Sequence, residues 1–185
     1  MESGYQEAEL LREAVSQHLV LMVRQVNLLT DETMTDPLTG LLNRKGFNTR
    51  IKALSPVGNH CVIAIDIDCF KNINDRYGHD TGDAVLVSIG QILILLTRQN
   101  DIVCRFGGEA FIILLPDSSL QETFVVAERI RTVTAETSFA EGIHLTLPAG
   151  IAALPDCAGD FGQMLRQADL AMYLAKKSGR NWVCS

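Results

Sequence analysis

Asp66 and Asp68 are two carboxylates that stand two residues apart at the end of an almost continuous apolar run, residues 61–68. Such a β-branched run is typical of a central strand buried on both faces. Alternation along a strand places residues two apart on the same side. Acidic groups at the end of a buried strand are costly without a partner, and a divalent cation is the usual partner of such a pair. The stretch therefore predicts a metal site at a strand end.

Glu109 is a third carboxylate, at the tip of a predicted β-hairpin. Gly107 and Gly108 precede it, and short apolar runs at 102–104 and 111–115 flank the turn. Two adjacent glycines permit positive φ and place no Cβ in the path of a ligand that approaches the backbone, as a bulky triphosphate does. A tight hairpin with an exposed acid has the same pattern, so this turn alone does not separate a ligand site from a structural turn.

Groups that suit a nucleotide lie in two other parts of the chain. Lys71, Asn74 and Asp83 follow the acidic strand end, in a stretch rich in hydrogen-bonding side chains and with a candidate phosphate contact. Lys176 and Arg180 place two cations near the end of a predicted helix. Cations at a helix C-terminus also stabilise the helix itself, so these two residues fit an ordinary helix end equally well.

Length, composition and charge limit the function. The chain has 185 residues, 47% hydrophobic and 21% charged, which suits one soluble domain with an appendage. No apolar run approaches the roughly 18 residues that span a bilayer, and no signal sequence is recognised, so we expect a cytoplasmic protein without a membrane partner. A formal charge of −6 argues against binding to a nucleic-acid polymer. It does not exclude a small phosphorylated ligand.

The cysteines indicate neither a zinc site nor a disulfide framework. They are five in number, and none forms a Cys-x-x-Cys pair. We therefore expect reduced and mostly buried thiols at Cys61, Cys69, Cys104, Cys157 and Cys184.

Residues 1–34 are predicted to form an N-terminal helix, and residues 35–185 a separate domain. Residues 7–34 contain no Gly or Pro and many good helix formers. Apolar residues recur there at alternating spacings of four and three, the seam of a short coiled coil. We expect this helix to pair with a second copy and to set the oligomeric state or carry a signal, the alternative being an amphipathic helix docked on its own domain. The seam residues are Val15, Leu19, Met22, Val26 and Leu29.

The remaining elements predict an α/β fold. Asp36 and Pro37 predict a helix restart, with Asp36 as the N-cap and Pro37 at the first helical position. That helix ends near residues 55–58. Further helices are expected at 83–98, 124–133 and 160–177, with Gly179 as the C-cap of the last one. Strands are expected at 143–154 and 182–183, and Pro148 makes part of the strand at 143–154 an edge or a bulge. Alternating strands and helices around an antiparallel hairpin indicate a mixed central sheet flanked by helices.

Known motifs of other nucleotide and hydrolase sites are absent from the sequence. There is no P-loop, no G-x-S-x-G and no H-E-x-x-H. What remains is a set of carboxylates at a strand end and at a hairpin tip.

Residues 35–185 resemble the GGDEF domain family, the diguanylate cyclases, whose fold is nucleotide-cyclase-like. Several separate motifs match in order, and together they are very specific. They are Asp36-Pro37-Leu38-Thr39-Gly40-Leu41-Leu42-Asn43-Arg44, then Asp66-Ile67-Asp68-Cys69-Phe70-Lys71-Asn72-Ile73-Asn74-Asp75, then Tyr77-Gly78-His79 with Gly82-Asp83, then Arg105-Phe106-Gly107-Gly108-Glu109, and last Ala168-Asp169 with Ala175-Lys176-Lys177-Ser178-Gly179-Arg180-Asn181.

The resemblance implies an activity. Such domains condense two GTP into cyclic di-GMP, a bacterial second messenger, and release pyrophosphate. It implies that Asp66, the Ile67 carbonyl and Glu109 hold two magnesium ions, with manganese as the alternative. Because each domain binds one GTP, two copies must face each other as a homodimer.

The resemblance also assigns the nucleotide contacts. It implies that Asn74 and Asp83 read the guanine edge and that Lys71, Lys176 and Arg180 contact phosphates.

A second ligand site is implied by Arg98 and Asp101. They match the family's R-x-x-D product-inhibition motif, in which Arg98 pairs with phosphate or guanine of cyclic di-GMP and Asp101 with its base. The alternative is a helix-terminal arginine beside an ordinary capping aspartate.

Ala110 departs from the family pattern. Active relatives usually carry Glu at this position, and its carboxylate takes part at the metal site. Loss of a preorganised charged group costs on the order of a hundred- to a thousand-fold in rate. Three interpretations stay open: a weak or inactive domain, a natural variant that still turns over, or a deliberately inactivated variant. The sequence therefore fits two functions, a dimeric diguanylate cyclase and a catalytically silent module that senses GTP or cyclic di-GMP.

Overall fold

The computed structural model describes residues 13, 15–19, 21–22, 34–157 and 160–185. The chain divides into two compact units, Met1–Met34 and Thr35–Ser185. In the first unit the described positions 13–22 are helical. Of the predicted seam residues, Val15, Leu19 and Met22 are exposed in the single chain, and Val26 and Leu29 lie outside the described residues. Pairing of this helix with a second copy stays a prediction.

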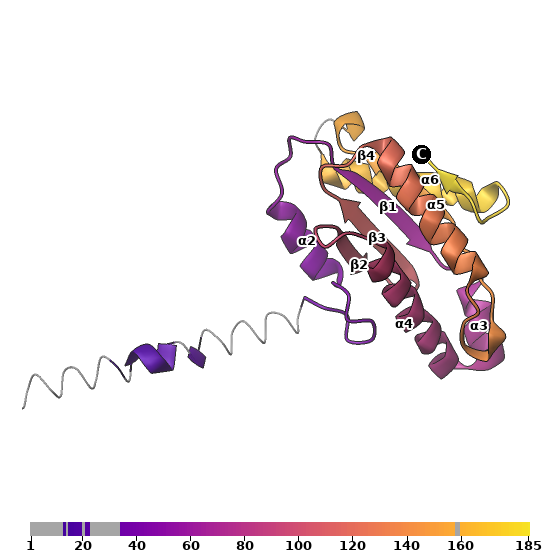
Figure 1. Ribbon diagram of the computed structural model, residues 1–185, viewed down its shortest axis with the longest axis horizontal. Coiled ribbons are helices and arrows are strands. Elements are labelled where there is room, and N and C mark those ends of the chain that lie inside the picture. The colour runs from indigo at the N-terminus through magenta and orange to yellow at the C-terminus, as the bar shows by residue number, and fades with distance from the viewer. Residues whose placement is uncertain (1–12, 14, 20, 23–33, 158–159) are drawn as a thin grey trace, which may run out of the picture. The chain divides into compact units, whose positions relative to one another are not determined.

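A five-stranded mixed sheet forms the centre of the second unit (Figure 1). Its order is β2-β3-β1-β4-β5, and every neighbouring pair is antiparallel except β4 and β5. The predicted hairpin is confirmed by β2 and β3, and the predicted central strand by β1. The strands are β1 (Cys61–Asp66), β2 (Ile102–Arg105), β3 (Ala110–Leu115), β4 (Ala149–Ala153) and β5 (Val183–Cys184).

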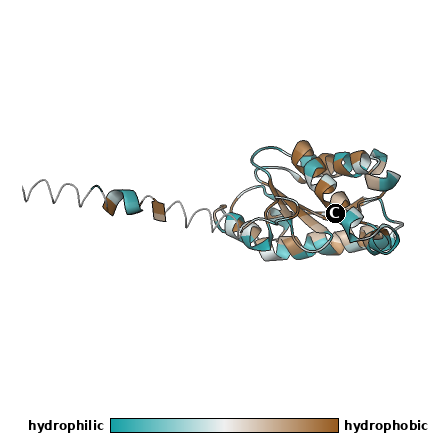
Figure 2. Ribbon diagram, turned by 90° about the horizontal axis from the view of Figure 1, so that it is seen from below, coloured by the Kyte–Doolittle hydropathy of each residue, from teal (hydrophilic) through white to brown (hydrophobic). Residues whose placement is uncertain are grey.

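Helices cover both faces of the sheet. In the described part of the chain α3, α4 and α5 pack on one face and α2 and α6 on the other, as the two separate core clusters show. Figure 2 shows the layers from the side, with the largely hydrophobic strands between helices of mixed hydropathy. The helices are α2 (Arg44–Lys52), α3 (Phe70–Tyr77), α4 (His79–Leu96), α5 (Leu120–Glu136) and α6 (Phe161–Lys177), with short 3₁₀ turns at Ala140–Gly142 and Pro155–Cys157.

Strand alternation divides β1 between the two cores. Ile63 and Ile65 point into the cluster under α3, α4 and α5, whereas Val62 and Ala64 belong to the cluster under α2 and α6. All four side chains are buried, which accounts for the continuous apolar run in the sequence. By the same alternation Asp66 lies on the α6 side of the strand.

Gly150 lets α6 approach the sheet closely. A Cβ built at this position in β4 would lie 2.0 Å from the Ala168 carbonyl oxygen and 2.2 Å from the Met172 nitrogen. Both clashes are with helix backbone, which has no flexible end to move aside. The glycine therefore fixes how near the end of α6 comes to the end of β1.

Two expectations about the elements were wrong, and one helix was not predicted. Asp36 and Pro37 open no helix, because residues 37–39 form a turn and α2 begins at Arg44 with Asn43 as its N-cap. Residues 143–148 are not a strand, and β4 begins after Pro148 as an interior strand rather than an edge. Residues 70–77 form α3, which the polar composition did not reveal.

The other element predictions are confirmed with small shifts. α5 begins with a capping box between Ser119 and Glu122. Gly179 follows α6 with φ of +113°, and the Arg180 N–H bonds back to the Ala175 carbonyl, as in a Schellman ending. The last strand is displaced by one residue from the predicted 182–183.

α4 has the length and mean hydropathy of a membrane span, with 18 residues at a hydropathy of 1.3. One side of it is buried in the domain, where Val85, Ile89 and Leu93 are completely covered. This is the pattern of a core helix, and no other helix in the described part of the chain has such length and hydropathy.

The five thiols are free, and three of them are buried. Cys61, Cys104 and Cys157 lie in the core, so the expectation of mostly buried cysteines is confirmed. Cys69 is the exposed one, directly after the acidic strand end.

Candidate active site

At the carboxyl end of β1, the side chain of Asp66 contacts the side chain of Lys176. The Lys176 ammonium, from the last turn of α6, donates to Oδ2 of Asp66, and the Asp66 side chain is 13% exposed. The other carboxylate oxygen accepts from the Ile67 N–H at 3.0 Å. The two residues are 110 positions apart in the sequence, so the close packing of α6 on the sheet is what unites them.

Glu109 belongs to the same electrostatic cluster. Its pKa is raised above the ordinary value of glutamic acid by partial burial first and by the charge of Asp66 second, while the ammonium of Lys176 opposes the rise. A neighbouring negative charge that raises the proton affinity of Glu109 also favours the binding of any other cation there. The structure therefore brings together Asp66, Glu109 and Lys176, which the resemblance assigns to one site.

Residue 110 lies directly opposite Asp66. The register of β1 and β3 pairs Asp66 with Ala110. Ala110 also lines a hollow of about 420 Å³ between α2 and α6, together with Arg44, Arg166 and Asp169. A glutamate in place of this alanine would face the Asp66 carboxylate on the neighbouring strand, and the hollow would leave room for its side chain.

Arg105 fixes the hairpin tip. Its Nη2 donates to the Gly108 carbonyl at 2.8 Å and its Nε to the same oxygen at 3.1 Å. Its Nη1 lies 3.1 Å from both carboxylate oxygens of Asp36. The sequence places Arg105 and Asp36 in two separate motifs but does not predict their contact, because the two residues meet only in the folded domain.

Asp36 in turn holds the loop before α2. Its Oδ2 accepts from the Thr39 N–H at 2.8 Å and from the Thr39 hydroxyl at 2.7 Å. Burial alone would raise the pKa of Asp36, but the bonds from Thr39 and the guanidinium of Arg105 outweigh it, so the pKa is lowered. Asp36 is therefore a structural anchor of the hairpin tip and not a helix cap.

Asp68 does not join Asp66, although strand alternation placed them on one side. β1 ends at Asp66, so the alternation no longer applies two residues later. Asp68 Oδ2 accepts from the Thr146 hydroxyl at 2.6 Å, and its Oδ1 lies 3.5 Å from Nε of Arg180. The paired-aspartate interpretation is thus corrected: Asp68 orients the phosphate-contact candidate Arg180.

Asn74 presents a buried acceptor without a partner. Its side-chain oxygen is buried, and no group in the described chain donates to it. A Cβ built at Gly82 of α4 would lie 1.9 Å from that oxygen, so the amide occupies the space that any side chain at position 82 would need. Buried polar atoms left unpaired are rare, and a ligand with an N–H is one way to satisfy this one.

Lys71 and Asp83 stand on α3 and α4, the two helices that also carry Asn74 and Gly82. Both are exposed. Within the described residues, no hydrogen bond or ion pair ties either one to the other candidate site residues.

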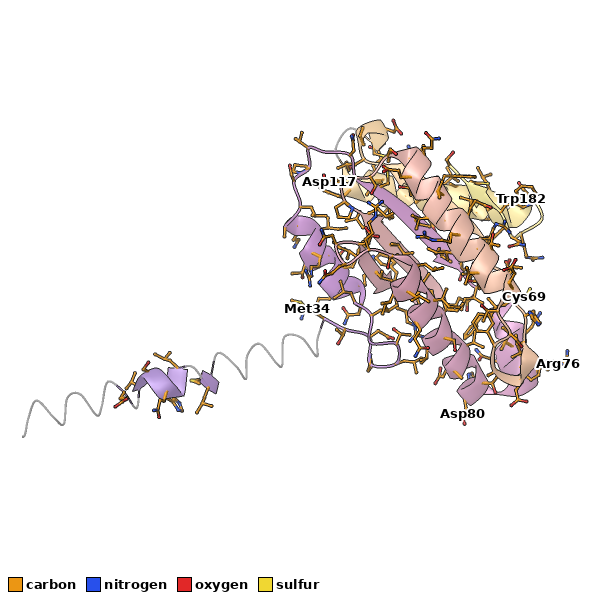
Figure 3. All side chains as sticks on the ribbon, in the orientation of Figure 1. Met34, Cys69, Arg76, Asp80, Asp117 and Trp182 are labelled. Atoms are coloured by element: carbon orange, nitrogen blue, oxygen red, sulfur yellow. The ribbon has the colours of Figure 1, made fainter. Side chains whose placement is uncertain are left out.

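The turn before α3 has a special backbone. Cys69 adopts a left-handed conformation, with φ of 57°, at the N-cap of α3. Such conformations in a residue other than glycine cost energy and gather at functional sites. Figure 3 shows Cys69 at the end of β1 remote from Asp117.

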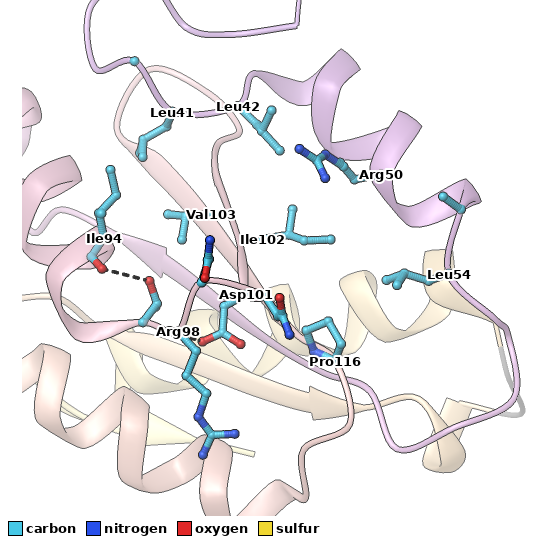
Figure 4. A pocket seen from close by; sticks show the side chains of 15 residues that line it. Leu41, Leu42, Arg50, Leu54, Ile94, Arg98, Asp101, Ile102, Val103 and Pro116 are labelled. Atoms are coloured by element: carbon cyan, nitrogen blue, oxygen red, sulfur yellow. Dashed lines mark hydrogen bonds between the residues drawn. The ribbon is translucent and has the colours of Figure 1, made fainter.

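Arg98 and Asp101 form a closed turn between α4 and β2. The Arg98 N–H donates to Oδ2 of Asp101 at 2.7 Å, and the Asp101 N–H donates to the Arg98 carbonyl at 3.0 Å. The Arg98 guanidinium points away from Leu41, Leu42 and Ile102, which line a hollow of about 680 Å³ beside the turn (Figure 4).

A second hollow lies beside the same turn, against α5. It has a volume of about 450 Å³ and is lined by both members of the Arg98–Asp101 pair, by Glu122 and by Arg129, which the sequence did not single out. The Arg129 Nη2 donates to the carbonyl of Leu96 at 2.6 Å.

The comparisons with known proteins identify the family. The model of the diguanylate cyclase GGDEF domain matches residues 33–182. The chain belongs to the GGDEF domain family. Its signature reads Gly-Gly-Glu-Ala-Phe at residues 107–111.

Curated relatives of this GGDEF domain include two named signalling proteins. The response regulator PleD of Caulobacter vibrioides is 38% identical over 160 residues, 81% of this chain and 35% of the relative. The diguanylate cyclase DosC of Escherichia coli is 38% identical over 184 residues, 94% of this chain and 40% of the relative. The chain thus spans two fifths or less of the length of these relatives.

Solved GGDEF structures have the same fold. The coiled coil and GGDEF domain of DgcB from Caulobacter crescentus, in complex with c-di-GMP, superposes with a TM-score of 0.80 at 28% identity, covering 94% of this chain and 96% of that one. The active GGEEF domain of a diguanylate cyclase from Vibrio cholerae superposes with a TM-score of 0.66 at 36% identity, covering 76% and 88%. The fold predicted from the sequence is confirmed.

Proposed function

We propose that this GGDEF domain is a diguanylate cyclase that condenses two GTP into cyclic di-GMP and releases pyrophosphate. The observation that carries the proposal is the convergence of Asp66, Glu109 and Lys176 at one end of the sheet. Two carboxylates beside an ammonium suit a metal-bound triphosphate, because the carboxylates bind the metal ion and the ammonium binds a phosphate group.

The donor set fits a hard divalent cation. Among the described residues no three His, Cys, Asp or Glu side chains form a metal cluster, so the protein supplies only the pair Asp66 and Glu109 with the Ile67 carbonyl. Magnesium takes few protein carboxylates and completes its shell with water and substrate phosphate oxygens. Magnesium, or manganese in its place, would neutralise the triphosphate and polarise the α-phosphorus.

The remaining residues orient the nucleotide. Gly107 and Gly108 are exposed at the hairpin tip, and their lack of a side chain leaves the backbone accessible to GTP. The unpaired oxygen of Asn74 suits an N–H of the guanine edge, with Asp83 on the next helix as a second acceptor. Lys71, Lys176 and Arg180 are the cations for the phosphates.

Catalysis requires two copies of the domain. One site holds one GTP, and the product joins two nucleotides, so two sites must face each other across a two-fold axis. We propose the N-terminal unit, Met1–Met34, as the segment that pairs the copies.

The direct test is product formation. Purified protein is incubated with GTP and MgCl₂, and cyclic di-GMP and pyrophosphate are measured by chromatography and a coupled assay. We expect product from this chain and none from Asp66→Asn. No product at high protein concentration would exclude the cyclase.

Ala110 supports a second candidate, a silent module that binds GTP or cyclic di-GMP. Without Glu at this position the site has two carboxylates instead of three. The hollow of about 450 Å³ beside Arg98, Asp101 and Arg129 offers cations for a cyclic dinucleotide whether or not the domain turns over. In either case we propose product binding at the Arg98–Asp101 turn, as inhibition in a cyclase and as sensing in a silent module.

Calorimetry with cyclic di-GMP tests the second site. Arg98→Ala is expected to lose affinity by about tenfold or more, since it removes a charge-assisted contact. Equal affinity of this variant and the unaltered chain would exclude the turn as the binding site.

A further inference from the structure

The turn that carries Arg180 has an unusual backbone. Gly179, Arg180 and Asn181 have φ angles of +113°, +62° and +53°, three left-handed residues in succession. Glycine adopts this conformation freely, but the other two residues do so at an energetic cost. Such a conformation persists only where surrounding contacts determine it.

One set of contacts comes from α5. Arg131 donates through Nη1 to the side-chain oxygen of Asn181 at 3.1 Å. The same guanidinium makes a two-point pair with Glu128, at 3.0 Å and 2.9 Å, in which the side chains are 22% and 34% exposed. The hydrogen bonds that Arg131 donates to the Glu128 carboxylate raise the pKa of Arg131 against the effect of its burial. Glu128 therefore holds the Arg131 guanidinium in the position from which it contacts the turn.

A second set comes from the loop after β1. Asp68, with a side chain only 7% exposed, lies 3.5 Å from Nε of Arg180. Its other oxygen is held by the Thr146 hydroxyl, and its own N–H donates to the Thr146 carbonyl at 3.1 Å. The Arg180 side chain is nevertheless 59% exposed, so its guanidinium is oriented and still open to a ligand.

We propose that Arg131 and Asp68 are positioning residues that clamp the 179–181 turn from two sides, so that Arg180 is preorganised to bind a phosphate group. The inference rests on the proposed function, since it names what orients one phosphate contact of that site. A preorganised cation binds phosphate more tightly because less side-chain freedom is lost on binding.

The competing explanation is purely structural. The same turn ends α6 and leads into β5, so Arg131 would then only stabilise that connection. The two explanations predict different mobility of the Arg180 side chain. They also predict different phosphate affinity in variants whose folding stability is unchanged.

Substitutions at Asn181 separate the explanations. Asn181→Gly removes the acceptor of Arg131 while relieving the left-handed strain, so the domain stays folded. Asn181→Asp keeps an acceptor and tolerates the same φ. Arg131→Met removes the clamp from the other side, and Lys52→Met, an exposed lysine at the end of α2, is the matched control for loss of one positive charge.

The first measurement needs no nucleotide. NMR relaxation of the Arg180 Nε–H group reports its motion on the picosecond to nanosecond timescale. We expect an ordered group in the unaltered chain, in Asn181→Asp and in Lys52→Met, and a mobile one in Asn181→Gly and Arg131→Met. An equally ordered group in all five proteins would overturn the clamp, whatever the protein's substrate.

The second measurement is binding of tripolyphosphate with MgCl₂ and, separately, of guanosine, by calorimetry. Asn181→Gly and Arg131→Met should bind tripolyphosphate about tenfold more weakly and guanosine unchanged, the loss expected for one charge-assisted contact. Unchanged tripolyphosphate affinity beside a mobile Arg180 would refute the phosphate role. Absence of GTP and tripolyphosphate binding in the unaltered chain would instead refute the proposed function, while the NMR result would still decide whether the clamp exists.

Discussion

Arg105 joins Asp36 to the hairpin tip across 69 residues of sequence. One guanidinium contacts both oxygens of the Asp36 carboxylate at 3.1 Å and, on its other side, the Gly108 carbonyl at 2.8 Å. The side chains of the pair are only 15% and 16% exposed. The position of the tip, and of Glu109 after it, therefore depends on the loop before α2.

Asp36→Asn and Arg105→Met are expected to destabilise the domain by about 1–3 kcal/mol each, because either change leaves a shielded polar group without its charged partner. We also expect about tenfold lower product formation. The double variant should cost less than the sum of the two, since both changes break the same pair. Chemical denaturation and initial rates provide the measurements, and strictly additive losses would contradict a direct coupling.

The Asp36–Arg105 pair also predicts that the domain becomes less stable at acidic pH. The lowered pKa of Asp36 means that the folded state holds its proton less tightly than the unfolded chain. The stabilisation is therefore complete above the ordinary pKa of aspartic acid and is lost as pH falls through the lowered value. Asp36→Asn should flatten this part of the stability profile, measured by thermal unfolding between pH 2 and 5.

Ala110→Glu is expected to raise the rate of cyclic di-GMP formation by tenfold or more. The new carboxylate would stand opposite Asp66 on the neighbouring strand, beside a hollow that can accept it. Without metal the same variant should be less stable, because like charges would face each other. A higher rate with a lower melting temperature in EDTA is the expected pair of results, and Ala110→Gln, which fills the space without the charge, is the control.

Glu109→Gln is expected to stabilise the metal-free domain at neutral pH while abolishing activity. The raised pKa of Glu109 means that the folded state binds this proton more tightly than the unfolded chain. Stability therefore falls as pH rises from the ordinary glutamate pKa through the raised one, and the penalty is complete above it.

The two pH regimes provide the check. At pH 7.5 in EDTA, Glu109→Gln should melt on the order of 1–3 °C higher than the unaltered chain, which corresponds to a fraction of 1 kcal/mol. Near pH 4 the two proteins should melt at the same temperature. MgCl₂ should raise the melting temperature of the unaltered chain only. An equal difference at both pH values would show that the charge of Glu109 is not the cause.

The limits of the sequence are seen in particular residues. β1, the hairpin and α6 could be predicted because their apolar patterns and glycines are local signals. The turn at Asp36 has the sequence pattern of a helix start, since its aspartate and proline fit both structures and Arg105, which decides between them, is far away in sequence. The sequence predicts that Asp68 pairs with Asp66, because nothing local shows that the strand ends at Asp66. The role of Arg131 has no motif at all, because it depends on α5 packing beside the end of α6.

Cys69 is expected to be the first of the five cysteines to react with iodoacetamide. It is exposed, whereas burial raises the pKa of the Cys104 thiol to about 12, and Asp36 adds to the rise. Because Cys69 lies between Asp68 and α3, a non-hydrolysable GTP analogue with MgCl₂ should slow its labelling severalfold. Peptide mass spectrometry measures both rates, with the partly exposed Cys184 as the reference thiol. Labelling of Cys69 that is insensitive to the nucleotide would place the triphosphate elsewhere.

Gly82→Ala is expected to abolish guanine recognition while leaving the fold intact. The added methyl group would lie 1.9 Å from the Asn74 oxygen and would force that amide out of its position. Gly90→Ala on the same helix is the matched control, because its methyl group would meet Thr39 at an ordinary 3.4 Å. Both changes raise helix propensity by a similar amount, about 1 kcal/mol, so any difference comes from the contacts. Calorimetry with the GTP analogue should show at least tenfold weaker binding for Gly82→Ala alone, whereas equal weakening of tripolyphosphate would mean that α4 has shifted as a whole and that Asn74 is not what reads the base.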